Sequence, residues 1–483
     1  MRSRRPRGAF LAMAATAAMG GALLAASDGS AGAAQAGVDA PALAAGTWHK
    51  AIELTGPAGR VDASITTVSC PSKGNCSAGG YYVDRSSHLQ ALVVTEHAGH
   101  WGKAVEVPGT AALNTGGFAV VNSMSCPSPG NCAANGSYAF SPFKNQMFVV
   151  SEVAGKWGQI HVVPGRVSVV DASISCASPG NCVTGSSLLT TSGQFQAFLI
   201  EETNGTWSQP FSLSGAGLQT SDYSDIDSVS CLSAGNCTAT GTDRPNHIYQ
   251  LFAVGETGGQ WRKAVTIPLS GAIDSVNQGV GINTMSCASP GNCAAAGNYG
   301  YAVEDTIYQQ PFVISETGGK WGKATDVPGL ARPSQGGFGD TTSVSCAAPD
   351  TCTAGGFLSV GSKPRRAFLV TETGGHWAHV VMLAGSPALG GARPTQVNSV
   401  SCTAPGRCVA GGTYTHSGSQ AFVVTEAGGR WGQARPVPGL AKLNVGGTAE
   451  IHSIDCSSAN HCTATGIYGD RSHNFQAFAA SES

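Results

Sequence analysis

Charged side chains are scarce in this sequence. Asp, Glu, Lys and Arg make up 12% of its 483 residues, about half the usual share. The 27 basic residues face 29 acidic ones, so the basic excess expected of a nucleic-acid-binding protein is absent. The sequence also lacks Gly-x-Ser-x-Gly, His-Glu-x-x-His and protein-kinase motifs. The composition indicates a near-neutral globular protein with no nucleic-acid partner, and it points to no particular reaction.

The N-terminus has the pattern of a secretory signal peptide. Four arginines within residues 1–7 precede an Ala-rich apolar run over 9–26, and small residues follow over 30–36. We expect 1–36 to be a signal peptide and 37–45 a linker. The protein would then be secreted, with no stable membrane span after cleavage. An uncleaved membrane anchor is the alternative, because the apolar run reaches about 18 residues.

Internal repetition is the strongest signal in the sequence. Eight Cys-x5-Cys pairs recur at intervals of 50 to 59 residues, and we number the repeats 1 to 8 by these pairs. Each pair spans a predicted hairpin, which brings its two cysteines to disulfide distance. The spacing does not fit zinc sites of the Cys-x2-Cys type. We therefore predict one disulfide within each repeat: Cys70–Cys76, Cys126–Cys132, Cys176–Cys182, Cys231–Cys237, Cys287–Cys293, Cys346–Cys352, Cys402–Cys408 and Cys456–Cys462.

Each repeat reads as four short strands. The strands are short apolar segments bounded by Gly, Pro, Asn and Ser. In chain order they are Ser-Val-Ser-Cys, Cys-x-Ala-x-Gly, Gln-Ala-Phe-Val-Val and a segment from Trp to Val-Pro. The last repeat lacks its fourth strand, whereas a spare one containing Trp48 precedes the first repeat. A ring closed by the N-terminal strand explains this offset and leaves no sheet edge exposed. We predict an all-β fold over 46–483: a single eight-bladed β-propeller with four antiparallel strands per blade, in which 48–52 pair with 476–480.

The turn between the third and fourth strands resembles a known motif. Thr-Glu-Thr-Gly-Gly-His-Trp at 371–377 and Ser-Glu-Thr-Gly-Gly-Lys-Trp at 315–321 are similar to the Asp-box, Ser-x-Asp-x-Gly-x-Thr-Trp, of sialidase-like propellers. Here the Asp is replaced and one residue before Trp is missing. The resemblance covers all repeats and implies the propeller fold. The motif is structural, so it implies no catalytic residue.

Glu and Trp each recur once per repeat. A catalytic carboxylate needs one special environment, so a recurring Glu indicates a structural role. We expect these Glu side chains to accept hydrogen bonds from the glycine-rich turn that follows them, and the tryptophans to wedge between adjacent blades. The Glu residues are Glu96, Glu152, Glu202, Glu256, Glu316, Glu372, Glu426 and Glu482.

The loops from second to third strands and the loops from one repeat to the next lie on the same face of the predicted propeller. These loops do not repeat in sequence, so we expect any binding or catalytic site on this face. Just before each first strand, a mostly polar and uncharged set would surround the channel mouth: Thr66, Asn122, Ala172, Asp227, Asn283, Thr342, Asn398 and His452. Ordered water or a sugar or peptide ligand would suit this set. The candidate ligand-binding residues are Asn122, Asp227, Asn283, Asn398 and His452, with Tyr223 as a stacking platform.

One loop at the entry to repeat 4 is rich in carboxylates. Asp222, Asp225 and Asp227 fall within seven residues, and carboxylate oxygens are the ligands that Ca²⁺ prefers. A calcium site is the hypothesis here, and an acidic turn with solvated charges is the alternative. No other cofactor is predicted.

These features favour a secreted, monomeric, non-catalytic binding or scaffold propeller whose partner is a glycan or a cell-surface protein. The alternative is an extracellular glycan hydrolase or lyase that uses Asp222, Asp225, Asp227 and His452 as catalytic residues. Two carboxyl groups within roughly 5 to 10 Å of each other across a cleft would favour the enzyme.

Overall fold

The computed structural model describes residues 46–57, 62–142, 144–167, 173–213, 218, 223–274, 278–304, 306–330 and 336–483. All of them belong to one compact unit, Leu43–Ser483. The predicted signal peptide (1–36) and linker (37–45) lie outside the described residues. Within the described ranges, no helix is long and apolar enough to cross a membrane.

Every repeat folds into an antiparallel meander, with its strands paired in chain order. The first strands are β2 (Ala63–Ser72), β7 (Ala119–Ser128), β12 (Ser175–Ser178), β17 (Ser224–Ser233), β22 (Val280–Ser289), β27 (Gly337–Ala348), β32 (Pro394–Ala404) and β37 (Ala449–Ser458). The second strands are β3 (Asn75–Val83), β8 (Asn131–Ser141), β13 (Asn181–Leu189), β18 (Asn236–Asp243), β23 (Asn292–Val303), β28 (Thr351–Val360), β33 (Arg407–Thr415) and β38 (His461–Gly469). The third strands are β4 (Leu89–His97), β9 (Lys144–Val153), β14 (Phe195–Thr203), β19 (Gln250–Thr257), β24 (Thr306–Thr317), β29 (Arg366–Thr373), β34 (Ser419–Ala427) and β39 (Phe475–Ser481).

The fourth strand of repeats 1 to 7 is divided into two short pieces, both paired with the third strand. The pieces are β5 (His100–Trp101) and β6 (Val105–Glu106), β10 (Lys156–Trp157) and β11 (His161–Val162), β15 (Thr206–Trp207) and β16 (Phe211–Ser212), β20 (Gln260–Trp261) and β21 (Val265–Ile267), β25 (Lys320–Trp321) and β26 (Thr325–Asp326), β30 (His376–Trp377) and β31 (Val381–Met382), and β35 (Arg430–Trp431) and β36 (Arg435–Pro436). Helical segments are confined to α1 (Thr110–Leu113), α2 (Gly271–Asp274), α3 (Leu440–Leu443) and the 3₁₀ turns Pro245–His247 and Pro387–Leu389 in the described chain.

The last sheet takes its fourth strand from the N-terminal segment. Strand β1 (Ile52–Glu53) pairs antiparallel with β39, with Ile52 opposite Ala479. Trp48 forms a bridge with Glu482, and the Thr47 and His49 amides donate to the carbonyls of Ser483 and Ser481. The register equals that of repeat 1, where Trp101 lies opposite Glu96. The N-terminal segment therefore occupies the position that a fourth strand occupies in the other repeats.

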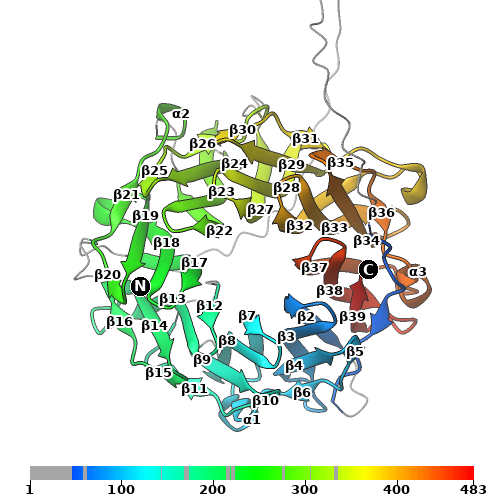
Figure 1. The fold of residues 1–483 in the computed structure, drawn as a ribbon, viewed down its shortest axis with the longest axis horizontal. Coiled ribbons are helices and arrows are strands. Elements are labelled where there is room, and N and C mark those ends of the chain that lie inside the picture. The colour runs from blue at the N-terminus through cyan, green and yellow to red at the C-terminus, as the bar shows by residue number, and fades with distance from the viewer. Residues whose placement is uncertain are drawn as a thin grey trace, which may run out of the picture. The chain divides into compact units, whose positions relative to one another are not determined.

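The sheets are arranged around a common centre, with the first strands innermost and the divided fourth strands outermost (Figure 1). Antiparallel meanders stacked face to face in this way make a β-propeller. The sheets of repeats 5 and 6 are further joined by one parallel contact between Gln309 and Phe338.

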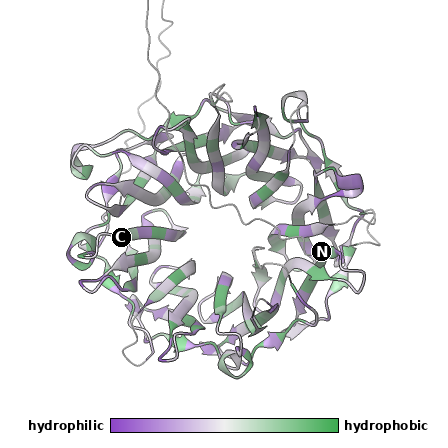
Figure 2. Cartoon of the chain, turned by 180° about the vertical axis from the view of Figure 1, so that it is seen from behind, coloured by the Kyte–Doolittle hydropathy of each residue, from purple (hydrophilic) through white to green (hydrophobic). Residues whose placement is uncertain are grey.

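The hydrophobic core lies between neighbouring sheets. Hydrophobic residues occur in all the sheets (Figure 2), and the third strands bury both of their faces. In β4, Leu92 and Val94 pack in one core cluster, and Ala91 and Val93 pack in the next. The phenylalanine of the Gln-Ala-Phe segment is among the largest fully buried side chains of this core in repeats 2 to 8. These residues are at most 2% exposed: Phe148, Phe198, Phe252, Phe312, Phe368, Phe422 and Phe478.

All eight predicted disulfides are present, one in each repeat. Each links the first strand to the second, beside a tight turn. In repeat 1 this turn requires glycine, because Gly74 has a φ of 66° and a Cβ there would lie 2.7 Å from the amide nitrogen of Gly99. The Gly99 amide donates to the Gly74 carbonyl. The first hairpin turn thus rests directly on the turn between the third and fourth strands.

The serines of Ser-Val-Ser-Cys join one repeat to the next. Ser399 Oγ accepts from the Ile454 amide at 2.9 Å, and Ser401 Oγ accepts from the Cys456 amide at 3.1 Å. Equivalent bonds connect the other neighbours, for example Ser343 to Val400 and Ser345 to Cys402. Because the first strands of different repeats are not paired with one another in a ladder, these side chains satisfy backbone donors that would otherwise be buried without partners.

The same bonds connect repeat 8 to repeat 1. Ser453 Oγ accepts from the Val68 amide at 3.2 Å. Asp455, which replaces the second serine, accepts from the Cys70 amide at 2.6 Å. The two ends of the described chain are therefore joined through both the innermost and the outermost strands of their sheets.

Candidate functional site

The structure places the predicted channel-mouth residues inside the first strands rather than before them. The first strands begin several residues earlier than the Ser-Val-Ser-Cys pattern suggested, and each predicted residue is the extra residue of a β-bulge. The register shifts at Thr66, Asn122, Asp227, Asn283, Thr342, Asn398 and His452. Ala172 lies outside the described residues. A bulge residue is left out of the ladder, so its side chain is available for other contacts.

Several bulge side chains bond to the backbone of the next repeat. Asn398 Nδ2 donates to the Ile451 carbonyl at 2.7 Å, and Thr342 Oγ1 donates to the Val397 carbonyl at 2.6 Å. His452 Nδ1 lies 2.7 Å from the Ile65 carbonyl, which requires a proton on that nitrogen. Each acceptor is the residue just before the next bulge, so these bonds give the set a role in joining repeats. A role in ligand binding stays a prediction.

Among the predicted enzyme residues that the structure describes, the two aspartates and His452 are not brought together. Strand β17, which contains Asp225 and Asp227, lies across the ring from β37, which contains His452 (Figure 1). Asp225 Oδ2 accepts from the Tyr223 hydroxyl at 3.0 Å, and Asp227 Oδ2 accepts from Thr242 at 2.9 Å. This arrangement offers no shared cleft to these carboxylates and the imidazole.

The Asp-rich segment also differs from the predicted loop. From Ser224 onward it is part of β17, because Ile226 is buried in the core and the flanking aspartates face the other way. Asp222 lies outside the described residues. Across the ranges that the structure covers, no group of three His, Cys, Asp or Glu side chains is placed to hold a metal ion. Calcium binding stays a prediction.

Cavities instead lie on the opposite face from the one expected, between the turns of neighbouring repeats. One of about 380 Å³ lies between repeat 8 and repeat 1, and we call it the seam cavity. It is bounded by the N-terminal segment, the first turn of repeat 1 and strands β38 and β39. The corresponding space between repeats 7 and 8 is about 20 Å³.

Two residues of the seam cavity depart from the repeat pattern. Lys73 stands where every other repeat has Pro or Ala, and His461 stands where five repeats have Asn. In repeat 1 that Asn is Asn75, whose amide donates to Ser72 and Lys73 and whose carbonyl accepts from Ala98. Asn75 thus fixes the two turns to each other. Departures from a structural pattern at one junction are the sequence signal that points to this cavity.

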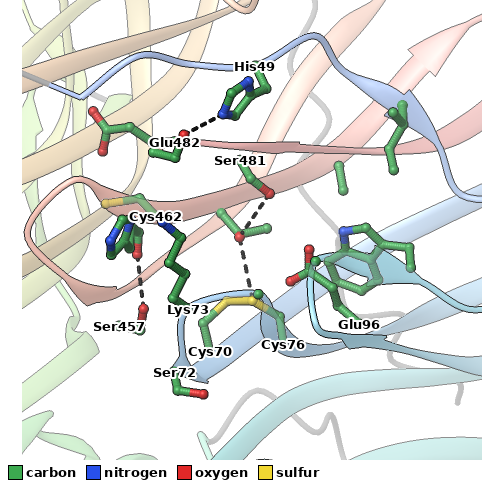
Figure 3. A pocket seen from close by; sticks show the side chains of 18 of the residues that line it. His49, Cys70, Ser72, Lys73, Cys76, Glu96, Ser457, Cys462, Ser481 and Glu482 are labelled. Carbon is green, nitrogen blue, oxygen red and sulfur yellow. Dashed lines mark hydrogen bonds between the residues drawn. A yellow bond between two sulfur atoms is a disulfide. The ribbon is translucent and has the colours of Figure 1, made fainter.

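The seam cavity has polar atoms without partners. Glu96 is 5% exposed and its Oε2 makes no hydrogen bond, and the same is true of the buried His461 Nδ1. Burial raises the pKa of Glu96. Lys73 extends from the first turn of repeat 1 toward the strand with Cys462 (Figure 3). A ligand with hydroxyl or acidic groups would satisfy these atoms, because unpaired buried polar groups are costly.

The recurring Glu residues differ from expectation in their partners. Ser151 Oγ donates to Glu202 at 2.6 Å, and Thr95 Oγ1 donates to Glu152 at 3.1 Å. Each donor belongs to the preceding repeat, not to the glycine-rich turn. The tryptophans bridge repeats as predicted, since the Trp207 indole donates to Ser151 at 3.0 Å. The sequence of one repeat contains no information about the neighbouring sheet, so the prediction considered only the turn of the same repeat as a partner.

No protein-family model matches this chain, and no curated protein matches it. Among solved structures, it is similar to a GH74 xyloglucanase from Xanthomonas campestris, with 12% identity and a TM-score of 0.49 over 82% of this chain and 56% of that one. It is also similar to Sqt1 from Chaetomium thermophilum, with 10% identity and a TM-score of 0.49 over 88% and 97% of the two chains. A post-proline cleaving enzyme from Rickettsia typhi matches at 10% identity and a TM-score of 0.44 over 76% and 51%. The chain spans little more than half the length of either enzyme.

Proposed function

We propose that this protein is a secreted, non-catalytic β-propeller that binds a carbohydrate in the seam cavity. The observation behind this proposal is that Lys73 and His461, two residues that depart from the repeat pattern, line the same cavity of about 380 Å³ as the unpartnered carboxyl of Glu96. Repeated residues explain the scaffold. Residues that break the repeat at one junction, around an open cavity, favour a ligand there.

The cavity offers the groups that sugars need. Trp101 lines it, and an indole face can stack on the apolar face of a pyranose. Ser72, Thr463 and Ser481 supply hydroxyl groups along its walls. Small-ligand sites run from about 300 to 1,000 Å³, so the volume suits one or two sugar residues. Lys73 is the group that would favour an acidic sugar over a neutral one.

The proposal includes a closed ring of eight blades. It is supported by the pairing of β1 with β39 and by the bonds from Ser453, Asp455 and His452 to the first strand of repeat 1. It is also supported by the eight Cys pairs of the sequence. The seam cavity would then lie at the junction between the last and the first blade, where the outer strand of the last blade comes from the N-terminal segment.

An extracellular location fits the cysteines. All sixteen form disulfides and none is free in the described chain, which is typical of proteins outside the reducing cytoplasm. Export through the predicted signal peptide at 1–36 is part of the proposal. A glycan or cell-surface ligand would be met in that compartment.

Binding of soluble oligosaccharides to the purified protein tests the proposal. We expect isothermal titration with a panel of neutral and uronate-containing oligosaccharides to find saturable binding. Lys73→Ala and Glu96→Gln should each weaken it at least tenfold. Glu426→Gln is the control, since Glu426 holds the same position in repeat 7 as Glu96 holds in repeat 1 but lines the cavity of about 20 Å³ between repeats 7 and 8 instead of the seam cavity.

Thermal melting separates folding from binding in these variants. Lys73→Ala removes an exposed side chain from a turn, so its melting temperature should match that of the parent protein. Failure of the whole panel to bind, or equal binding by the parent, Lys73→Ala and Glu96→Gln, would overturn the assignment.

A further inference from the structure

The junction between repeats 3 and 4 differs from the others at the end of the third strand. Six repeats have a hydroxyl residue immediately before the recurring Glu, as in Ser151-Glu152. Repeat 3 has Glu201 before Glu202, and repeat 4 has Gly255 before Glu256. At three junctions this hydroxyl donates to the Glu of the following repeat: Thr95 to Glu152, Ser151 to Glu202 and Ser315 to Glu372. Between repeats 3 and 4 the donor is therefore replaced by a second carboxylate.

Glu256 consequently faces a carboxylate where Glu152, Glu202 and Glu372 face a hydroxyl donor. It is 7% exposed, and its Oε2 makes no hydrogen bond. Burial, and next the charge of Glu201, raise the pKa of Glu256 to about 7. A carboxyl in this setting lacks the group that would stabilise its ionised form.

Glu201 is held in place from repeat 4. The Trp261 indole donates to Glu201 Oε1, whereas the indoles of Trp207 and Trp377 donate to Ser151 and Ser315. Trp261 lies opposite Glu256 on the neighbouring strand. One indole therefore orients one member of the pair beside the other.

Both carboxylates line a cavity of about 390 Å³ between the two repeats. Glu202 lines it as well, but accepts from Ser151. The remaining walls are turn backbone at Gly235, Gly258 and Gly259, with small and polar side chains. No Lys, Arg or His is among the described residues that line it, so the negative charge has no counterpart there.

We propose that this cavity binds a primary ammonium group at the end of an alkyl chain, with Glu201 and Glu256 as its charged partners. A positive group placed between the two carboxylates would restore the ionised state of Glu256 and satisfy its Oε2. A compact metal ion is disfavoured, because no three ligating side chains in the described part of the chain are placed for one. An ammonium accepts wider spacing than a metal ion does, since it donates three separate hydrogen bonds. This site is independent of the seam cavity.

Two probes distinguish the sources of such a group. Spermidine represents a free polyamine, and Nα-acetyl-lysine methylamide represents a lysine side chain of a peptide. In thermal melting and calorimetric titration at physiological salt, at least one of them should bind saturably and raise the melting temperature. Glu201→Gln and Glu256→Gln should each weaken that binding at least tenfold.

The control is Glu316→Gln. Glu316 of repeat 5 is also buried, and its Oε2 also has no partner. At the junction between repeats 4 and 5, however, the residue of repeat 4 in the position of Glu201 is Gly255, so there is no second carboxylate. The Glu316→Gln variant should bind the probe as the parent does. Glu201→Ser, which restores the repeat pattern, should fold and lose binding. Absence of binding by both probes, or equal weakening by Glu316→Gln, would overturn the proposal.

Discussion

The junction between repeats 7 and 8 and the junction between repeats 8 and 1 are built from the same three contacts. At the first, Asn398, Ser399 and Ser401 bond to the backbone of repeat 8. At the second, His452, Ser453 and Asp455 bond to equivalent positions of repeat 1. Two of the three residue types differ, while the backbone atoms that they contact are equivalent. Contact between repeats therefore depends on bulge and serine positions rather than on chain continuity.

The two junctions differ in the volume of the space between their turns. The space between the turns is about 20 Å³ at the first junction and about 380 Å³ at the second. The second is also the junction where Lys73 and His461 replace the repeated residues. Inner contacts are uniform because they hold the sheets together. The turns are less constrained and can be modified for a ligand.

The largest expected effect comes from removing the N-terminal strand. Deletion of 46–56 would expose the edge of β39 and remove the buried Leu54 and the Trp48 bridge. We expect a loss of more than about 4 kcal/mol of unfolding free energy, comparable to truncating a large core residue, or strand exchange between molecules. Urea unfolding and light scattering measure the two outcomes.

Removal of 37–45 alone is the control for that deletion and should leave stability unchanged. If deletion of 46–56 left both the unfolding midpoint and the mass unchanged, the pairing of β1 with β39 would contribute nothing, and the eight-bladed closed ring would lose its main support.

An intermediate effect is expected at Asp455. Burial raises its pKa to about 6, although the Cys70 and Cys456 amides donate to it. Because the folded-state pKa exceeds the unfolded value, the cost of ionisation is absent at low pH and appears as pH rises from about 4 to 6. Asp455→Ser should therefore stabilise the protein at pH 7 by about 1–2 kcal/mol, less than the full pKa shift implies because the variant also loses the hydrogen bond that the carboxylate accepts from the Cys456 amide.

The reciprocal variant sharpens this comparison. Ser401→Asp, made in the Asp455→Ser protein because Ser401 hydrogen-bonds to Asp455, places the carboxylate between repeats 7 and 8 and should lower stability at pH 7 by a similar amount. Urea unfolding at pH 4 and pH 7.5 measures both. A pH-independent difference between Asp455→Ser and the parent protein would show that the carboxylate charge is not responsible.

The smallest effect is expected at the bulges. His452→Asn keeps a donor to the Ile65 carbonyl and should change stability by less than about 0.5 kcal/mol, whereas His452→Ala and Asn398→Ala should each cost about 1 kcal/mol, the usual net value of one hydrogen bond. Chemical unfolding of the three variants provides the comparison. A much larger loss for His452→Ala than for Asn398→Ala would mean that the two junctions are not equivalent.

The repeating features could be predicted from the amino-acid sequence alone. The Cys-x5-Cys spacing predicted every disulfide, because six positions across a hairpin fix the distance between two strand ends. Alternating apolar residues predicted short strands, and the spare Trp48 segment predicted a partner for the C-terminal strand.

The bonding partner of each repeated side chain depends on how the sheets pack together, so it could not be predicted. The serines, the recurring Glu residues and the bulge residues all find partners in the next sheet, some 50 to 60 residues away in the chain. A local pattern contains no information about such neighbours. The position of the cavities followed from the same cause: they form where turns of two repeats meet, so Lys73 and His461 share one wall although 388 positions separate them.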